Sequence, residues 1–248
     1  MSWAINVSDL CFSYGNGNMV FDHLDFSINN HESVAIIGAN GTGKSTLLRI
    51  LVGLLNYHGE IEVAGLRLNR NNLAKIRKEI GFVFQDSNNQ LFMPTLYDDM
   101  AFGLRNAQIP DEKAEELIDE ALVKVDITYL KNRSNHKMSG GERKLAAIAT
   151  ILAMKPGIIL FDEPSIALDP YNRRNLINIL NSIENTKVIA THDLDLAYET
   201  CERGILLSPD GKMFDGDLSE IFNDEALLNK CHLEPPLFMQ KAKRKGNS

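Results

Sequence analysis

The strongest constraint on this chain is a glycine-rich segment that lies between two apolar runs. The segment reads Gly-Ala-Asn-Gly-Thr-Gly-Lys-Ser over residues 38–45, which is the pattern of a phosphate-binding loop. The preceding run, residues 34–37, is typical of a buried strand, and residues 47–51 are typical of a helix. In this order, backbone N–H groups and the positive end of the helix dipole converge on phosphate oxygens. The segment therefore predicts a nucleoside triphosphate site.

Two side chains of this loop carry the predicted chemistry. Lys44 is expected to reach the terminal phosphates, and the Ser45 hydroxyl is expected to ligate Mg²⁺. The remaining residues expected to surround the phosphates are Gly38, Asn40, Gly41, Thr42, Gly43 and Thr46.

Composition limits the class of protein. The chain has 248 residues, enough for one large domain or two small ones, and its net charge of −7 argues against broad binding to nucleic acid. No signal peptide is expected, and the longest apolar stretch, residues 145–154, is about half of what a bilayer crossing needs. Cys11, Cys201 and Cys231 lack metal-ligand spacing, so each is expected to be a small buried residue.

Strand-like and helix-like patterns alternate along the chain and predict an α/β fold with a mostly parallel sheet. Ligands bind such sheets at the carboxyl ends of the strands, where Gly38, Asp162 and His192 are predicted to lie. The runs that read as strands are 3–12, 24–37, 61–63, 81–84, 158–161 and 187–191, and helical patterns cover 114–125, 143–154 and the residues after Asp169-Pro170.

Two acidic residues follow the apolar run 158–161. Asp162 is placed to hold the Mg²⁺ hydration shell, and Glu163 is expected to point toward an attacking water as general base. The alternative is a pair of solvated acids at the end of a strand.

A second glycine-containing turn, Ser139-Gly140-Gly141-Glu142, precedes the helical pattern 143–154. Free N–H groups and a helix dipole again define an anion site, although a simple N-cap is the competing explanation. One chain rarely needs two phosphate sites unless two chains share the nucleotide, so this turn predicts a dimer.

With these motifs together, the chain resembles the ATP-binding subunit of an ATP-binding-cassette (ABC) transporter over about residues 3–220. Residues 138–142 are similar to the signature motif, residues 158–164 to the Walker B strand, residues 167–169 to the D-loop, Gln85 to the Q-loop, His192 to the switch histidine and Tyr14 to the aromatic residue beneath adenine. The resemblance implies a P-loop NTPase fold, with a RecA-like mostly parallel sheet, an antiparallel β subdomain and an α-helical subdomain at about 88–155. It implies an ABC ATPase domain over 1–233 and a basic tail over 234–248.

The resemblance also implies roles for these residues, with ATP and Mg²⁺ as cofactors. Lys44, Gln85, Glu163 and His192 would be catalytic, and Ser45, Gln85 and Asp162 would hold the metal. Tyr14 would stack on adenine, unless it is only a partly buried aromatic at a strand end. Asp169 would cap its helix, contact the other subunit, or do both. Ser139, Gly140, Gly141 and Glu142 would bind the nucleotide held by the other subunit.

Residues 84–92 and 94–103 are similar to energy-coupling-factor (ECF) ATPases. This implies solute uptake through membrane-embedded subunits, with the chain peripheral at the cytoplasmic face of the membrane. It would form a homodimer, or a heterodimer with a related ATPase, and would not bind nucleic acid. Leu145 and Thr150 depart from the family pattern, which often has charged residues or glycine there. Residues 91–93 are predicted to be a loop that either joins the core or lines a groove for a membrane partner.

Two other functions remain open from the residues alone. One is a soluble ABC-type ATPase that acts on nucleic acid or ribosomes, although only about 100 residues, without a cysteine cluster, separate the phosphate loop from the signature turn. The other is a regulatory module that binds nucleotide without hydrolysing it, against which the intact Gln85, Glu163 and His192 argue.

Overall fold

The computed structural model describes residues 3–15, 17–208, 211–237 and 239–240. The chain forms two compact units, which we call the core unit (residues 1–77 and 186–248) and the helical unit (residues 78–185). The basic cluster at residues 241–245, part of the predicted tail, lies outside the described residues.

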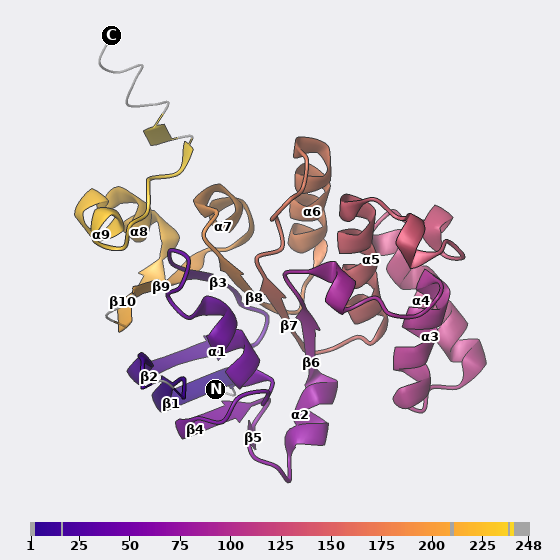
Figure 1. The fold of residues 1–248 in the computed structure, drawn as a ribbon, viewed down its shortest axis with the longest axis horizontal. Coiled ribbons are helices and arrows are strands. Elements are labelled where there is room, and N and C mark those ends of the chain that lie inside the picture. The colour runs from indigo at the N-terminus through magenta and orange to yellow at the C-terminus, as the bar shows by residue number, and fades with distance from the viewer. Residues whose placement is uncertain (1–2, 16, 209–210, 238, 241–248) are drawn as a thin grey trace. The chain divides into compact units, whose positions relative to one another are not determined.

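The core unit contains two sets of paired strands (Figure 1). One is an antiparallel sheet in the order β2-β1-β4-β5, as the resemblance implied. In the other, β3 pairs in parallel with both β8 and β9, and β10 pairs antiparallel with β9. The strands are β1 (Trp3–Ser13), β2 (Met19–Asn29), β3 (Ser33–Ile37), β4 (His58–Val63), β5 (Leu66–Arg67), β8 (Thr186–Thr191), β9 (Arg203–Ser208) and β10 (Gly211–Asp217).

The run expected as strand over residues 24–37 is two strands, β2 and β3, separated by a turn at residues 30–32. His31 in this turn adopts a left-handed backbone (φ 63°), which ends the extended conformation. Strand β3 is apolar without alternation because it lies between two neighbouring strands, and residues 34–37 are completely buried. The helices of this unit are α1 (Lys44–Leu51), α7 (Leu194–Thr200), α8 (Leu218–Asn223) and α9 (Glu225–Lys230), and α2 (Leu73–Glu79) crosses its boundary in the sequence.

The helical unit pairs two parallel strands, β6 (Ile80–Val83) and β7 (Ile158–Asp162), and contains most of the long helices. Helix α4 begins after Pro110, and the predicted apolar stripe from Ala114 to Leu122 is its buried face. The helices are α3 (Leu96–Asn106), α4 (Asp111–Lys124), α5 (Gly140–Ala153) and α6 (Pro170–Ser182), with 3₁₀ turns η1 (Ser87–Asn89), η2 (Thr128–Leu130) and η3 (Asn135–Lys137).

Helix α5 starts earlier than the expected residue 143, because the two glycines form its first turn behind the N-cap Ser139. Helix α6 begins at Pro170 behind the N-cap Asp169, as the sequence predicts. Among the described residues, the helices are all too short or too polar to span a lipid bilayer.

Candidate functional site

The phosphate loop of the core unit connects the end of β3 to the start of α1. The buried Lys44 folds back over it, and its Nζ donates to the carbonyl oxygens of Gly38 (2.8 Å) and Ala39 (3.1 Å). The Thr42 hydroxyl donates to the same Ala39 oxygen at 3.0 Å. The loop is therefore closed around its own lysine.

Glycine is required in this loop for two reasons, the backbone conformation and the lack of space for a side chain. Gly43 has a left-handed φ of 96°, and a Cβ there would lie 2.6 Å from a methyl carbon of Val20. A Cβ on Gly38 would lie 2.5 Å from the Thr42 hydroxyl and 2.7 Å from the Leu207 carbonyl oxygen. The backbone therefore fits an anion-binding loop, and a side chain at Gly38 or Gly43 would clash with neighbouring atoms.

The start of α1 is electrostatically suited to an anion. The first turn reads Lys-Ser-Thr-Leu and holds no acidic residue, and the N-cap position is Gly43, which has no side chain to occupy the helix N-terminus. The dipole of the eight-residue helix adds positive potential at the same end. These residues could hold a phosphate chain together with a divalent ion on Ser45.

Tyr14 and His192 belong to the same unit as the phosphate loop. Tyr14 follows β1 and is 43% exposed, and its hydroxyl is hydrogen-bonded to the Thr46 hydroxyl on α1 at 2.8 Å. Its ring packs edge-on against Phe12, with centroids 4.9 Å apart. His192 is exposed at the end of β8, whose Thr191 is the register partner of Ile37, so it lies at the same strand edge as the loop. The structure thus brings Tyr14, the phosphate loop and His192 to one region of the core unit.

The predicted acids lie at the carboxyl edge of the parallel strand pair in the helical unit. Asp162 ends β7 and is 2% exposed, and Glu163 after it is 4% exposed. Glu163 has a left-handed backbone with φ 46°, which redirects its side chain from the strand alternation. Val83 of β6 pairs with Phe161 of β7, so the exposed Gln85 follows at the same edge. The two acids are buried, which argues against the alternative that they are merely solvated acids at the end of a strand.

The signature turn forms a complete capping box at the start of α5. The Ser139 hydroxyl accepts from the Glu142 N–H at 3.2 Å, and the Glu142 carboxylate accepts from the Ser139 N–H at 2.7 Å. Arg133 lies 3.5 Å from the same carboxylate. The bond from the Ser139 backbone stabilises the anion and lowers the pKa of Glu142, although burial opposes it. This turn therefore has an N-cap, as the competing explanation held.

The signature turn is also packed against the first turn of α6, which sequence reasoning did not anticipate. A Cβ on Gly141 would lie 2.6 Å from the side-chain nitrogen of Asn172. Asn172 is in the first turn of α6, where its N–H donates to the N-cap carboxylate of Asp169 at 3.0 Å. The bonds from Asn172 also lower the pKa of Asp169. The Asn172 side chain, one turn beyond the D-loop, thus lies against the signature glycine.

Two further residues missed at the sequence level connect the Q-loop to α5. The buried Lys144 donates to the carbonyl oxygens of Gln85 (2.6 Å) and Phe84 (3.3 Å), and its burial lowers its pKa. Gln90 donates to Ala147 O (2.6 Å) and to the Thr150 hydroxyl (3.0 Å). One signal in the sequence could have revealed Lys144. It is a charged residue directly before the apolar run 145–149, within the same predicted helix. Thr150, a departure from the family pattern, is a direct partner in this connection.

The loop at residues 91–93 is buried at one end and exposed in its middle. Leu91 is buried, whereas Phe92 is 66% exposed and packs edge-on against the exposed Phe102 at 5.3 Å between centroids. The buried Asp99 accepts from the N–H groups of both Phe92 and Met93 at 3.1 Å. Asn135 donates to Asp99 and to the Met93 carbonyl oxygen. A buried carboxylate therefore holds an aromatic pair at the surface of the helical unit.

Comparison with known proteins agrees with this geometry. The ABC transporter family model matches residues 21–166, which include the phosphate loop, Gln85, the signature turn and the two acids. An ABC transporter ATP-binding protein of Geobacter sulfurreducens is 43% identical over 237 residues, covering 95% of each chain. The energy-coupling factor transporter ATP-binding protein EcfA of Carboxydothermus hydrogenoformans is 38% identical over 97% of this chain and 90% of its own length.

A solved structure is also similar to this chain. The structure of CbiO1 from Clostridium perfringens, described as part of the ABC transporter complex CbiONQ, superposes with a TM-score of 0.83. It is 31% identical and covers 93% of this chain and 94% of that one. The fold is that of an ABC ATPase, with a mixed, mostly parallel sheet, an antiparallel β subdomain and a helical region. The chain belongs to the ABC transporter family, as an ATP-binding ATPase subunit that energises transport.

Proposed function

We propose that this chain hydrolyses ATP to power solute uptake, by closing head to tail with a second ATPase subunit around two nucleotides. The second subunit is another copy of this chain or a related one. The observation that carries the proposal is the presence of two different glycine-lined helix N-termini in one chain, at α1 and α5. Each nucleotide is bound by the phosphate loop of one subunit and by residues 139–142 of the other.

The residues of the core unit bind the nucleotide. Tyr14 stacks on adenine, a contact worth about 1–3 kcal/mol per base that is tolerant of base identity. The Lys44 ammonium leaves its carbonyl partners for the terminal phosphates, where charge-assisted hydrogen bonds are stronger. The backbone N–H groups of residues 38–46 surround the phosphate chain. His192 contacts the γ-phosphate and orients Glu163.

Glu163 is the general base that accepts a proton from the attacking water. Its burial excludes competing solvent, and its left-handed backbone aims the carboxylate away from the strand direction. Gln85 positions the same water. Mg²⁺ would be held by Ser45, Gln85 and Asp162, and when bound it neutralises charge on the phosphate oxygens. The hydroxyl, amide and carboxylate oxygens of these residues are the donors that Mg²⁺ prefers.

The helical unit transmits closure to a membrane-embedded partner. Lys144 and Gln90 hold the Q-loop against α5, so that nucleotide contacts at Gln85 move with the signature helix. The exposed pair Phe92 and Phe102 is an apolar surface suited to a short helix of that partner. The chain would act as a peripheral protein at the cytoplasmic face, in an assembly of the energy-coupling-factor type. The similarity to EcfA and to CbiO1 supports this assignment.

The proposal is tested with Glu163→Gln, which removes the base and keeps the shape. With saturating Mg·ATP this variant is expected to bind nucleotide, to lose about 10²–10⁴-fold in hydrolysis rate and to accumulate as a dimer. Light scattering after size exclusion measures the dimer, and the double variant Glu163→Gln/Lys44→Ala is the monomeric control. Wild-type hydrolysis would exclude Glu163 as the base. Detergent-solubilised complexes, analysed by mass spectrometry, identify both the second ATPase subunit and the membrane partner.

A further inference from the structure

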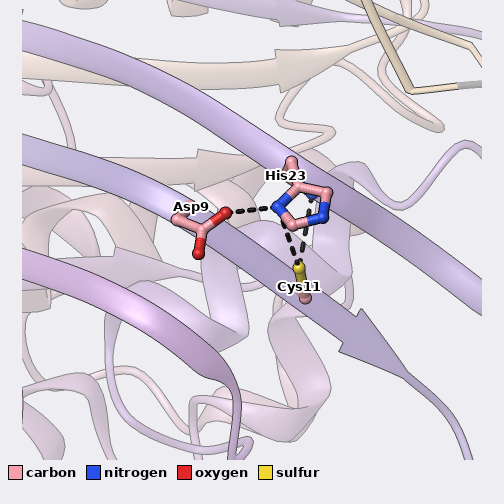
Figure 2. Close-up of side chains that lie close together, drawn as sticks. All are labelled: Asp9, Cys11 and His23. Atoms are coloured by element: carbon pink, nitrogen blue, oxygen red, sulfur yellow. Dashed lines mark hydrogen bonds and ion pairs between the residues drawn. The ribbon is translucent and has the colours of Figure 1, made fainter.

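Three side chains of types that can ligate a metal converge on the antiparallel sheet of the core unit. Asp9 and Cys11 lie on β1 and His23 lies on β2, and their ligand atoms are within 4.8 Å of one another (Figure 2). The Cys11 sulfur is 3.9 Å from His23 Nδ1, and an Asp9 carboxylate oxygen is hydrogen-bonded to the same nitrogen. Cys11 is only half-buried, so the expectation of a small buried residue is wrong for it, whereas Cys201 and Cys231 are buried.

The backbone of the two strands is shaped to bring these side chains together. Asp9 and His23 both adopt left-handed conformations, with φ of 55° and 51°. The β1–β2 register shifts on both sides of Leu10, which marks bulges that change the direction of side chains. Gly59 on β4 passes so close to the bulge that a Cβ would lie 2.3 Å from the Asp9 carbonyl oxygen. Strands β1, β2 and β4 thus all contribute to the local geometry around the three side chains.

The geometry fits a shared cation better than a proton relay. In a relay the acid and the thiol would bind opposite nitrogens of the imidazole, but here both approach Nδ1. The other nitrogen, Nε2, lies 3.7 Å from the Asp22 carboxylate. A carboxylate on the remote nitrogen orients the ring of a metal-binding histidine. The Asp9 N–H is itself held by Asp25 at 2.8 Å, so the ligands have supporting contacts.

We propose that Asp9, Cys11 and His23 bind one divalent transition-metal ion of the zinc type. A thiolate, an imidazole and a carboxylate form a donor set of the kind that zinc takes, and the thiolate disfavours Mg²⁺ and Ca²⁺. Three protein ligands leave one position for water. His58 is the exposed register partner of Cys11 on β4, but it lies outside this cluster. The site is exposed, so the ion exchanges with solvent, and it is separate from the residues assigned to Mg·ATP.

The test uses the untagged, reduced, nucleotide-free full chain. Zn²⁺ competition against a chromophoric chelator is expected to show one bound ion per chain with a dissociation constant of about 1 μM or lower. Co²⁺ is expected to give a thiolate-to-cobalt charge-transfer band. Cys11→Ser should abolish the band, and Asp9→Asn and His23→Asn should each weaken Zn²⁺ binding at least about tenfold. Asparagine tolerates the left-handed backbone at both positions.

The matched control is His31→Asn, since His31 also has a left-handed backbone (φ 63°) but is not in the cluster. It should bind Zn²⁺ like the wild type. Failure of the wild type to bind one equivalent, or a cobalt band that persists in Cys11→Ser, would overturn the proposal. A second measurement requires no variant: Zn²⁺ should slow alkylation of Cys11 in the wild-type chain. An unchanged alkylation rate would also overturn it.

Discussion

The two glycine-containing turns of this chain look alike in sequence but differ in structure. The phosphate loop leads into α1 through Gly43, and a lysine lies over its backbone. The signature turn leads into α5 through Ser139, and a glutamate of the same turn accepts its N–H. The first turn is basic and its helix N-terminus is uncapped by side chains, whereas the second carries its own anion. The same glycine signal therefore marks an uncapped helix N-terminus in one case and an internally capped one in the other.

This difference explains why the second turn needs a partner in the proposed mechanism. With Glu142 on the Ser139 N–H, the start of α5 is already partly neutralised. In the proposed mechanism it would therefore bind phosphate weakly by itself and contribute only when another subunit presents a nucleotide.

The largest effect is expected for Lys44→Ala. Removing the buried ammonium leaves the phosphates without their charged donor, a type of loss that costs about 2–5 kcal/mol. ATP affinity should fall by about a hundredfold or more, as measured by titration of a fluorescent ATP analogue. Removing the hydroxyl of the other turn with Ser139→Ala should leave the affinity of the monomer nearly unchanged. Equal losses of ATP affinity in Lys44→Ala and Ser139→Ala would contradict the proposed difference between the two turns.

The second prediction compares the neighbouring glycines of the signature turn. Gly141→Ala places a methyl group 2.6 Å from the Asn172 side chain, whereas a Cβ on Gly140 meets no atom within 4 Å. Gly141→Ala should lower the free energy of unfolding by about 1–3 kcal/mol, and Gly140→Ala should not lower it. Urea denaturation measures both. If the second substitution Asn172→Ser restores the unfolding free energy of Gly141→Ala, the contact with Asn172 is the cause of the loss. Identical stabilities of Gly141→Ala and Gly140→Ala would exclude this cause.

A smaller effect is expected from Glu142→Gln. The amide can still accept the Ser139 N–H, but the negative charge next to the partner nucleotide is lost. In the Glu163→Gln background with Mg·ATP, the dimer should become several-fold tighter, since surface charge pairs contribute about 0–1 kcal/mol. Sedimentation velocity over a concentration series measures this. A weaker dimer would show that Glu142 contributes attraction, for example through Arg133.

The smallest effect is the pH dependence of the capping box. Because folding lowers the pKa of Glu142 from 4.5, its stabilising contribution is complete above pH 4.5 and is lost as the pH falls through the lowered value. The unfolding free energy of wild type minus that of Glu142→Gln should therefore decrease between pH 6 and pH 3. Chemical denaturation at each pH measures it. A difference that grows on acidification would reverse the assigned sign.

Local signals in the sequence were sufficient for most of the candidate site. The glycine loop, the acids after β7, the N-cap Asp169 and the amphipathic α4 were predicted because each depends on neighbours within a few residues. The contact from Lys144 to Gln85 joins residues 59 apart in sequence, and no local pattern encodes that separation. The start of α5 was misplaced for a local reason, because glycine is a poor helix former that a capping box can nevertheless include.

By itself, the sequence determined that this chain binds a triphosphate and belongs to the ABC transporter family, because that chemistry depends on short contiguous motifs. Only the tertiary structure decided that Glu142 caps the signature turn, that Asn172 lies against Gly141, and that Asp9, Cys11 and His23 meet. These arrangements depend on strand bulges, helix starts and buried hydrogen bonds that bring distant residues together. Such contacts are selected by packing of the whole unit, and a linear pattern does not contain their geometry.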